Sequence, residues 1–255
     1  MKTVTACTIG IGTYLAGLAV GYQVILRDRC LTWGSTKDEV ERPMPGDDLI
    51  TAPDVVATRS ITIDADPTRI WPWLVQMGPG RGGAYTYDWI ENLLGLNMHS
   101  ADTVVPELQN LTVGDTFALG EKGPRMRVGV LEPGRALVFA SADGHWVWAF
   151  GLYPSAEGTR LVSRNRITLP DSALPTRVFN RFIMEPGSWV MERKMLLGIK
   201  QRAERTLAEE AVTVSDAPAE SAAGDHGTRA FGGISGTVSS AVVDAGPPTA
   251  PWIRE

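Results

Sequence analysis

A helical period governs the hydrophobic positions of residues 66–77, DPTRIWPWLVQM. Ile70, Trp73, Leu74 and Met77 are spaced i, i+3, i+4 and i+7, which is typical of one buried helix face. The segment opens with Asp-Pro, an N-cap followed by a proline at the first helical position. A second proline stands in the second turn. We therefore predict a short, bent helix.

A second short helix is predicted over residues 87–94. Tyr87, Ile90, Leu93 and Leu94 share one side of it, which we expect to face inward. The glycine-rich loop between the two helices matches the spacing G-x-G-x-x-G of dinucleotide-binding loops. That fingerprint requires a preceding strand. Because a helix precedes the loop here, we interpret it as a turn.

An alternating period predicts strands in the middle of the chain. They are expected over residues 56–64, 114–119, 125–132, 135–141, 145–153 and 159–169. Short glycine turns separate the later ones, so these strands should be sequential and antiparallel. Trp146, Trp148, Phe150 and Leu152 fall on one face of their strand. A face this aromatic must be covered or must line a cavity.

The chain after the last strand is again helical. Residues 175–183 predict a short helix that Pro186-Gly187 interrupts, and a longer helix follows over residues 188–209. Its apolar stripe comprises Met191, Met195, Leu196, Ile199, Ala203 and Leu207. Gly198 within it costs about 1 kcal/mol relative to alanine. Close approach of the sheet or a ligand would explain that glycine.

Residues 3–26 contain no charged side chain and are long enough to cross a hydrocarbon core about 30 Å thick. We predict a single-pass transmembrane anchor over residues 1–29, which places the protein in the cell membrane. Arg27 and Arg29 outweigh Lys2 and favour a cytoplasmic domain under the positive-inside rule. A cleaved signal peptide is the alternative.

The remaining segments divide by composition. Residues 30–55 are rich in proline and charge and are predicted as a connector, in which Thr36 and Glu39 resemble a capping box. Residues 56–210 then form the folded domain. From 211 to 255 the composition shifts to alanine, glycine, serine, threonine and proline without periodicity, which predicts a disordered tail.

Charge and cysteine content exclude several classes of protein. The net charge of −5 argues against nucleic acid as a partner. The chain has 2 cysteines and 3 scattered histidines, which predicts neither a disulfide framework nor a metal site. We see no cofactor signature and expect none. The oligomeric state stays open.

The order of elements resembles the START-like, or SRPBCC, superfamily, in its polyketide cyclase/dehydrase and lipid transport branch. The resemblance is carried by TRSITIDADPTRIWPWLVQMG (58–78), GRGGAYTYDWIENLLGLNMHSAD (80–102) and VMERKMLLGIKQRAE (190–204). TWGSTKDEVERPMPGDDL (32–49) is similar to the lead-in of membrane-tethered actinobacterial members. The resemblance implies an α+β helix-grip fold, an antiparallel sheet wrapped on a long C-terminal helix, with an apolar small molecule between them. It implies no mechanism.

With that fold, ligand-binding side chains are expected on both walls of the groove and on the glycine-rich loop. They are Trp73, Met77, Arg81, Tyr85, Tyr87, Trp89, Trp146, Trp148, Phe150, Met191, Met195 and Ile199. For the aromatic residues, plain core packing is an equal alternative. Arg81 would offer its charge to an acidic headgroup.

Polar side chains gather at residues 85–102. A catalytic acid/base pair there would be His99 with Asp88 or Asp102. The competing interpretation is that these residues cap helix ends and hold a polar loop. Arg164 and Arg166 share a strand face and are expected to be solvated, unless one enters the groove to bind a carboxylate.

Two functions follow from this reading. The first is binding of a hydrophobic small molecule, such as a lipid, isoprenoid or polyketide-like compound, by a membrane-anchored domain. The second is a cyclase or aromatase type of enzyme, in which the same cavity folds a reactive chain. A scaffold with an occluded core is the remaining alternative. Absence of a nucleophile motif favours the first.

Overall fold

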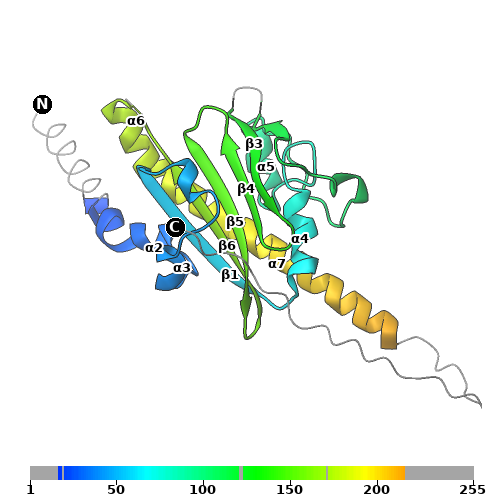
Figure 1. The fold of residues 1–255 in the computed structure, drawn as a ribbon. Helices are drawn as coiled ribbons and strands as arrows, with labels where there is room; N and C mark the ends of the chain where they lie inside the picture. Colours follow the sequence, from blue (N-terminus) through cyan, green and yellow to red (C-terminus); the bar gives the residue numbers. More distant parts are fainter. Residues whose placement is uncertain (1–16, 19, 121–122, 171, 216–255) are drawn as a thin grey trace, which may run out of the picture. The chain divides into compact units, whose positions relative to one another are not determined.

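An antiparallel sheet with a long helix across one face organises the fold (Figure 1). The computed structural model describes residues 17–18, 20–120, 123–170 and 172–215, and for residues 206–215 the backbone alone. The strands are β1 (Val55–Ile63), β2 (Thr116–Ala118), β3 (Arg125–Glu132), β4 (Ala136–Ser141), β5 (Trp146–Ser155) and β6 (Gly158–Ile167). The 6-stranded sheet has the order β1-β6-β5-β4-β3-β2. The predicted strands and their sequential antiparallel pairing are confirmed.

Short helices lie before, between and after the strands. Those before β1 are η1 (Tyr22–Leu26), α2 (Arg27–Leu31), α3 (Lys37–Glu41) and η2 (Asp47–Leu49). Those between β1 and β2 are α4 (Pro67–Val75), α5 (Asp88–Leu93) and η3 (Pro106–Leu108). The predicted N-cap of α4 is confirmed, because the Asp66 carboxylate accepts from the Thr68 N–H at 2.9 Å.

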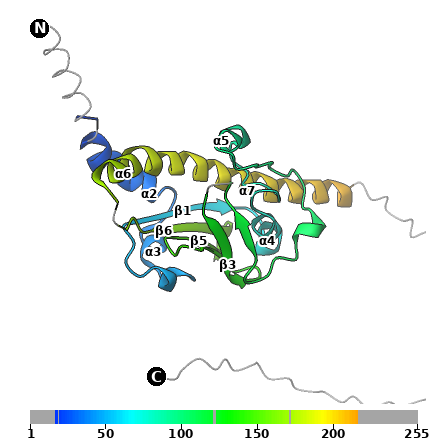
Figure 2. The same ribbon diagram turned by 90° about the horizontal axis from the view of Figure 1, so that it is seen from above.

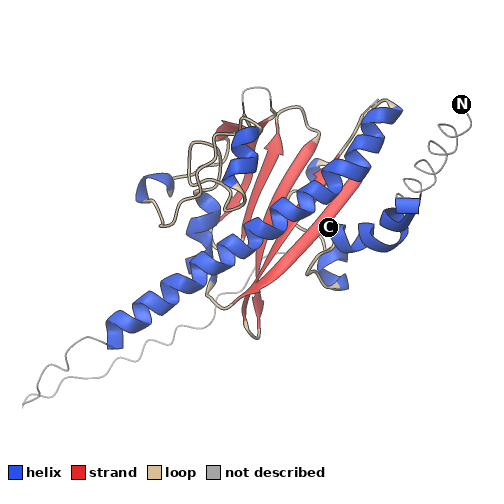
Figure 3. Ribbon diagram, turned by 180° about the vertical axis from the view of Figure 1, so that it is seen from behind, coloured by secondary structure: helices blue, strands red, loops and turns tan. Residues whose placement is uncertain are grey.

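The C-terminal helical region is continuous across Pro186. It comprises α6 (Leu174–Phe179), the π-helical turn η4 (Asn180–Met184) and α7 (Glu185–Ser215), and Figure 3 shows it as one long rod across the sheet. The predicted interruption at Pro186-Gly187 is therefore wrong. Prolines and π turns both mark local adjustments of helices. Here the π turn directly before Pro186 takes up the change in hydrogen bonding.

The face of the sheet under α7 carries the main core. Ile63 and Leu161 contribute from β1 and β6, Phe139 and Phe150 from β4 and β5, and Met195 from α7. Helix α4 closes one end of this core with Ile70, Trp73 and Leu74, the predicted inward residues. Period two of the strands sorts these side chains onto a single face, as the alternating pattern predicts.

The opposite face of the sheet is covered by residues 33–50, which we expected to be a connector. Figure 2 shows α7 on one side of the sheet and α3 on the other. Met44 and Ile50 pack on Val147 and Val162 there. The segment belongs to the same compact unit as the sheet.

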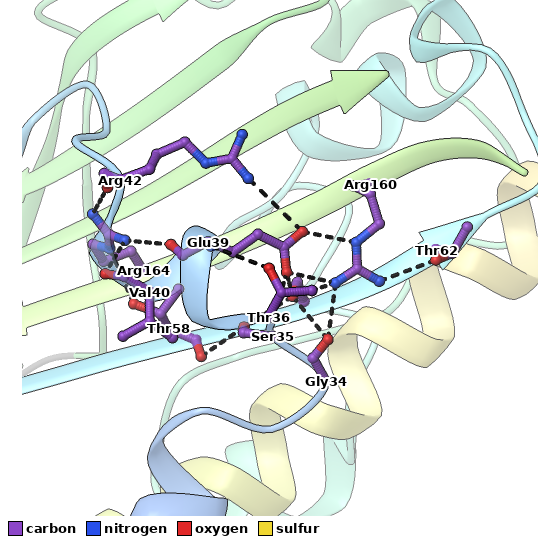
Figure 4. A network of polar contacts seen from close by, with 11 residues as sticks. Gly34, Ser35, Thr36, Glu39, Val40, Arg42, Thr58, Thr62, Arg160 and Arg164 are labelled. Carbon is purple, nitrogen blue, oxygen red and sulfur yellow. Dashed lines mark hydrogen bonds and ion pairs between the residues drawn. The ribbon is translucent and has the colours of Figure 1, made fainter. Parts of the chain in front are cut away.

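A polar network fixes the covering segment to the sheet (Figure 4). Glu39 forms the predicted capping box with Thr36, and its carboxylate also accepts from Arg160 at 2.8 and 2.7 Å. Arg164 donates to the carbonyls of Glu39, Val40 and Arg42. The expectation that Arg164 is solvated is wrong, since it is only 3% exposed.

Helical structure continues upstream of the covering segment in η1 and α2. The predicted anchor over residues 1–29 falls largely on residues 1–16, which lie outside the described part of the chain. In the part that is described, the helices are too short or too polar to cross a membrane. The predicted tail is described only as far as Ser215, where it continues α7.

Candidate functional site: a cavity between the sheet and helix α7

A cavity of about 410 Å³ lies between the inner face of the sheet and α7. Ligand pockets of proteins typically measure about 300–1,000 Å³. Its wall is formed by β1, β4, β5 and β6 on one side and by η4 and α7 on the other, with α5 and the loop before it at its edge. Residues on the wall include Ala57, Arg59, Ala84, Thr86, Glu91, Trp146, Trp148, Asn165, Met184, Met191, Glu192 and Met195.

A buried ion pair joins the two walls of the cavity. Arg59 of β1 donates to the carboxylate of Glu192 on α7, to the backbone carbonyl of Cys30 at 2.8 Å, and to the Ser188 hydroxyl at 3.2 Å. The side chains of Arg59 and Glu192 are 0% and 7% exposed. A buried charge is tolerated when it is paired and its hydrogen-bonding capacity is used. Both conditions hold for this pair.

The indole rings of the cavity are tied to the same ion pair. Ser163 donates to Glu192 at 2.5 Å and accepts from the Trp148 indole N–H at 3.0 Å. Asn165 donates to Glu192 at 3.1 Å and accepts from the Trp146 indole N–H at 2.8 Å. The two indoles stack, with ring centroids 5.8 Å apart. Their faces therefore form a rigid apolar floor, and their polar edges are satisfied by the protein.

Glu91 is a polar group of the wall that the described part of the protein does not satisfy. Its side chain is buried on α5, and its Oε2 atom has no hydrogen-bond partner among the described residues. Burial, with a smaller contribution from the Asp88 carboxylate, raises the pKa of Glu91 to about 7. Near neutral pH this carboxyl group therefore exists partly in its neutral form, which both donates and accepts hydrogen bonds.

The predicted ligand-binding residues divide into wall and core. Trp146, Trp148, Met191 and Met195 line the cavity. Trp73, Met77, Tyr85, Phe150 and Ile199 are buried in the main core behind it. The Tyr85 hydroxyl donates to the Trp73 carbonyl at 2.9 Å, which links the glycine-rich loop to α4.

The other predicted contacts lie away from the cavity. Arg81 donates to the carbonyls of Val75 and Leu108, so its charge holds two loops together. The Tyr87 ring lies under Lys194, with the Lys194 amine 5.9 Å from its centroid. Trp89 is 69% exposed, and its neighbours Leu93 and Leu94 are 79% and 69% exposed. The predicted inward face of α5 is therefore wrong, because the helix turns Glu91 inward instead.

The proposed acid/base pair is not assembled. Asp88 accepts from the backbone N–H and hydroxyl of Ser100 at 2.8 and 2.6 Å, and Asp102 pairs with Arg202 at 3.1 Å. His99 is exposed, and none of these carboxylates or the imidazole lines the cavity. The geometry agrees with the competing interpretation, in which these residues hold a polar loop against α5 and α7.

Sequence reasoning missed Arg59, Glu91, Asn165 and Glu192. One signal was available for two of them. Arg59 occupies an inward position of an otherwise apolar strand face, and Asn165 shares an inward strand face with Leu161 and Ile167. Polar residues at inward strand positions are buried only when they find partners. Glu192 and Glu91 offered no such signal, since acidic residues between apolar helix positions usually face water.

Similarity to solved structures is limited to the architecture. No protein-family model matches the sequence, and no curated protein matches it. A six-stranded antiparallel sheet with a long C-terminal helix is consistent with the helix-grip fold.

Several solved structures align with this chain. A polyketide cyclase-like protein of Corynebacterium glutamicum is 17% identical, with a TM-score of 0.30, over 65% of this chain and 97% of its own. An AHSA1-like protein of Aeromonas hydrophila is 17% identical, with a TM-score of 0.34, over 60% of this chain and 94% of its own. A protein of Mesorhizobium loti is 18% identical, with a TM-score of 0.36, over 60% of this chain and 98% of its own. Likeness of this degree identifies neither ligand nor reaction.

Proposed function

We propose that this protein binds one hydrophobic small molecule in the cavity between the sheet and α7. The observation that supports it is a cavity of about 410 Å³ whose tryptophan and methionine walls expose apolar surface. Burying that surface against a guest contributes about 25 cal/mol per Å². Lipids, isoprenoids and polyketide-like compounds have the required apolar surface.

We further propose that the domain works at a membrane, tethered by the uncharged segment at residues 3–26. Exposed apolar side chains support this part of the proposal. They occur on η1 (Val24, Ile25) and on α6 and η4 (Val178, Phe179, Ile183). Elements η1 and η4 contact each other, because the ring centroids of Tyr22 and Phe182 lie 5.7 Å apart.

The same apolar surface reaches the cavity. Met184 of η4 is 52% exposed and also lines the cavity wall. Exposed apolar patches that continue into a pocket are typical of binding surfaces. Under this proposal, a guest passes between the bilayer and the cavity beside η4.

The cyclase or aromatase alternative receives less support. It requires an acid or base facing the cavity. The pair expected for that role, His99 with Asp88 or Asp102, does not line the cavity, which leaves the Glu91 carboxyl group without that pair. The ion pair of Arg59 and Glu192 is engaged in structural hydrogen bonds. We therefore favour ligand binding over catalysis as the function of the cavity.

The test is native mass spectrometry of the full chain released from lipid nanodiscs, followed by solvent extraction. We expect a stoichiometric apolar guest, and expect Ala57→Leu to reduce its occupancy, because Ala57 lies on the cavity wall. Ala140→Leu on the opposite face of the sheet is the matched control and should retain the guest. Empty spectra, with no uptake of offered lipids, ketones or isoprenoid alcohols, would refute the proposal.

A further inference from the structure

The polar groups on the cavity wall differ in whether the protein already satisfies them. Glu192 is bonded to Arg59, Ser163 and Asn165, and Asp143 accepts from Ser141 at 2.5 Å. Glu185, also on the wall, pairs with Arg27 at 2.9 Å. Among the described wall residues, Glu91 alone has a buried side-chain atom without a partner.

The position of Glu91 is built by its surroundings. The N–H of Glu91 donates to the Tyr87 carbonyl, and its carbonyl accepts from the Leu96 N–H, so both ends of α5 hold its backbone. Asp88, one turn earlier, is engaged with Ser100. Buried polar side chains without a partner are uncommon in folded proteins and call for an explanation. A ligand atom is one such explanation.

Resting on the proposed function, we propose that Glu91 is the polar anchor of the cavity and donates a hydrogen bond to a carbonyl or hydroxyl oxygen of an otherwise apolar guest. The guest class is thereby a neutral oxygen-bearing lipid, such as a ketone or an alcohol, rather than a pure hydrocarbon. Its apolar part lies on the Trp146 and Trp148 floor, where indole edges are already satisfied.

The chemistry of the site supports a neutral guest. Burial raises the pKa of the Glu91 carboxyl to about 7, which keeps a donor proton available near neutral pH. An anionic guest would face this group together with the nearby Asp88 carboxylate. A cationic guest would require the ionised form and is the competing outcome of the test.

The experiment is competitive photoaffinity labelling of the full chain in nanodiscs with a diazirine analogue of 2-tridecanone. Peptides of the cavity wall are quantified by mass spectrometry against 2-tridecanone, tridecane and tridecylamine as competitors. In the unmodified protein we expect the ketone to compete at about tenfold lower concentration than tridecane, the effect of one hydrogen bond.

Variants separate the anchor from general uptake. Glu91→Leu should abolish the preference for ketone, whereas Glu91→Gln keeps a donor and should retain it. Glu107→Leu, an exposed position, is the matched control and should behave as the unmodified protein. All variants are compared in nanodiscs of the same lipid, so that differences in how the competitors partition into the bilayer affect every variant equally.

Three results overturn the inference or its basis. Equal competition by ketone and tridecane in the unmodified protein refutes the anchor and leaves the proposed function standing. Strongest competition by tridecylamine, lost in Glu91→Gln, shows that the carboxylate binds a cation and also refutes it. Absence of cavity labelling in every variant refutes the proposed function itself.

Discussion

Arg59 of β1 and Glu192 of α7 form an ion pair with almost no exposed surface, across the space between sheet and helix. The pair does more than join two elements. Through Ser163 and Asn165 it orients both tryptophans of the cavity floor. The pair therefore links α7 to the sheet beside the cavity.

Removing one partner should be costly. We expect Arg59→Met to lower the free energy of unfolding by about 3–5 kcal/mol, because Glu192 would be left as a buried, uncompensated charge. Adding Glu192→Leu should restore part of the loss. Urea unfolding followed by tryptophan fluorescence measures both, and a single variant as stable as the unmodified protein contradicts the role given to the pair.

Glu91 should make stability depend on pH near neutrality. Its pKa is raised from 4.5 to about 7 in the folded protein, so the folded state binds the proton more tightly. Its contribution to stability is therefore full below pH 4.5 and is lost as pH rises to about 7. The difference in the free energy of unfolding between the unmodified protein and Glu91→Gln should change by up to about 3 kcal/mol across this pH window. Parallel stability profiles for the two proteins would contradict the raised pKa.

Gly198 should not tolerate a side chain. A Cβ atom at this position would lie 2.4 Å from the Tyr85 carbonyl oxygen, which explains the glycine within α7. We expect Gly198→Ala to destabilise the fold by about 1–3 kcal/mol through overpacking, despite alanine's higher helix propensity. Gly187→Ala, in open space at the start of the same helix, is the control. Thermal unfolding should show no loss of stability in Gly187→Ala. An equal loss of stability in both variants would contradict the close approach of Gly198 to Tyr85.

Residues 33–50 should contribute to stability as part of the domain. Burial would raise the pKa of Glu39, but hydrogen bonds from Arg160, Thr36 and Ser60 outweigh it and lower that pKa to about 2. The stability it provides is present above pH 4.5 and is lost as pH falls toward 2.

Glu39→Ala should therefore lower the free energy of unfolding at pH 7 by about 3 kcal/mol, since Arg160 loses its buried partner. Glu41→Ala on the same helical turn is the matched control, because its side chain is 65% exposed. We expect its effect to stay within about 0.5 kcal/mol. Chemical denaturation of both variants checks this, and a negligible effect of Glu39→Ala would show that the segment is only a connector.

The strands, the caps and the main apolar faces could be predicted because each follows from local chemistry. Alternation along 145–153 sorts Trp146 and Trp148 to the inner face, and the structure confirms it. Asp66 and the Thr36–Glu39 box satisfy free N–H groups within a few residues of themselves. Such interactions do not depend on distant parts of the chain.

Long-range contacts decided the rest. Helix α5 has only six residues, too few for its apolar positions to fix its orientation, and in the folded protein it turns Glu91 toward the cavity and leaves Leu93 exposed. Arg164 is buried only because the carbonyls of residues 39–42 lie over it, more than 100 positions away in sequence. Periodicity cannot reveal a partner at that separation.

The sequence by itself determined the sheet, its inner face and the closing helix, since periodicity and capping are local properties. Only the tertiary structure decided which polar groups are satisfied. It left the Oε2 atom of Glu91 in the cavity wall without a hydrogen-bond partner among the residues that the structure describes. Whether a buried polar group has a partner depends on atoms brought together from distant segments.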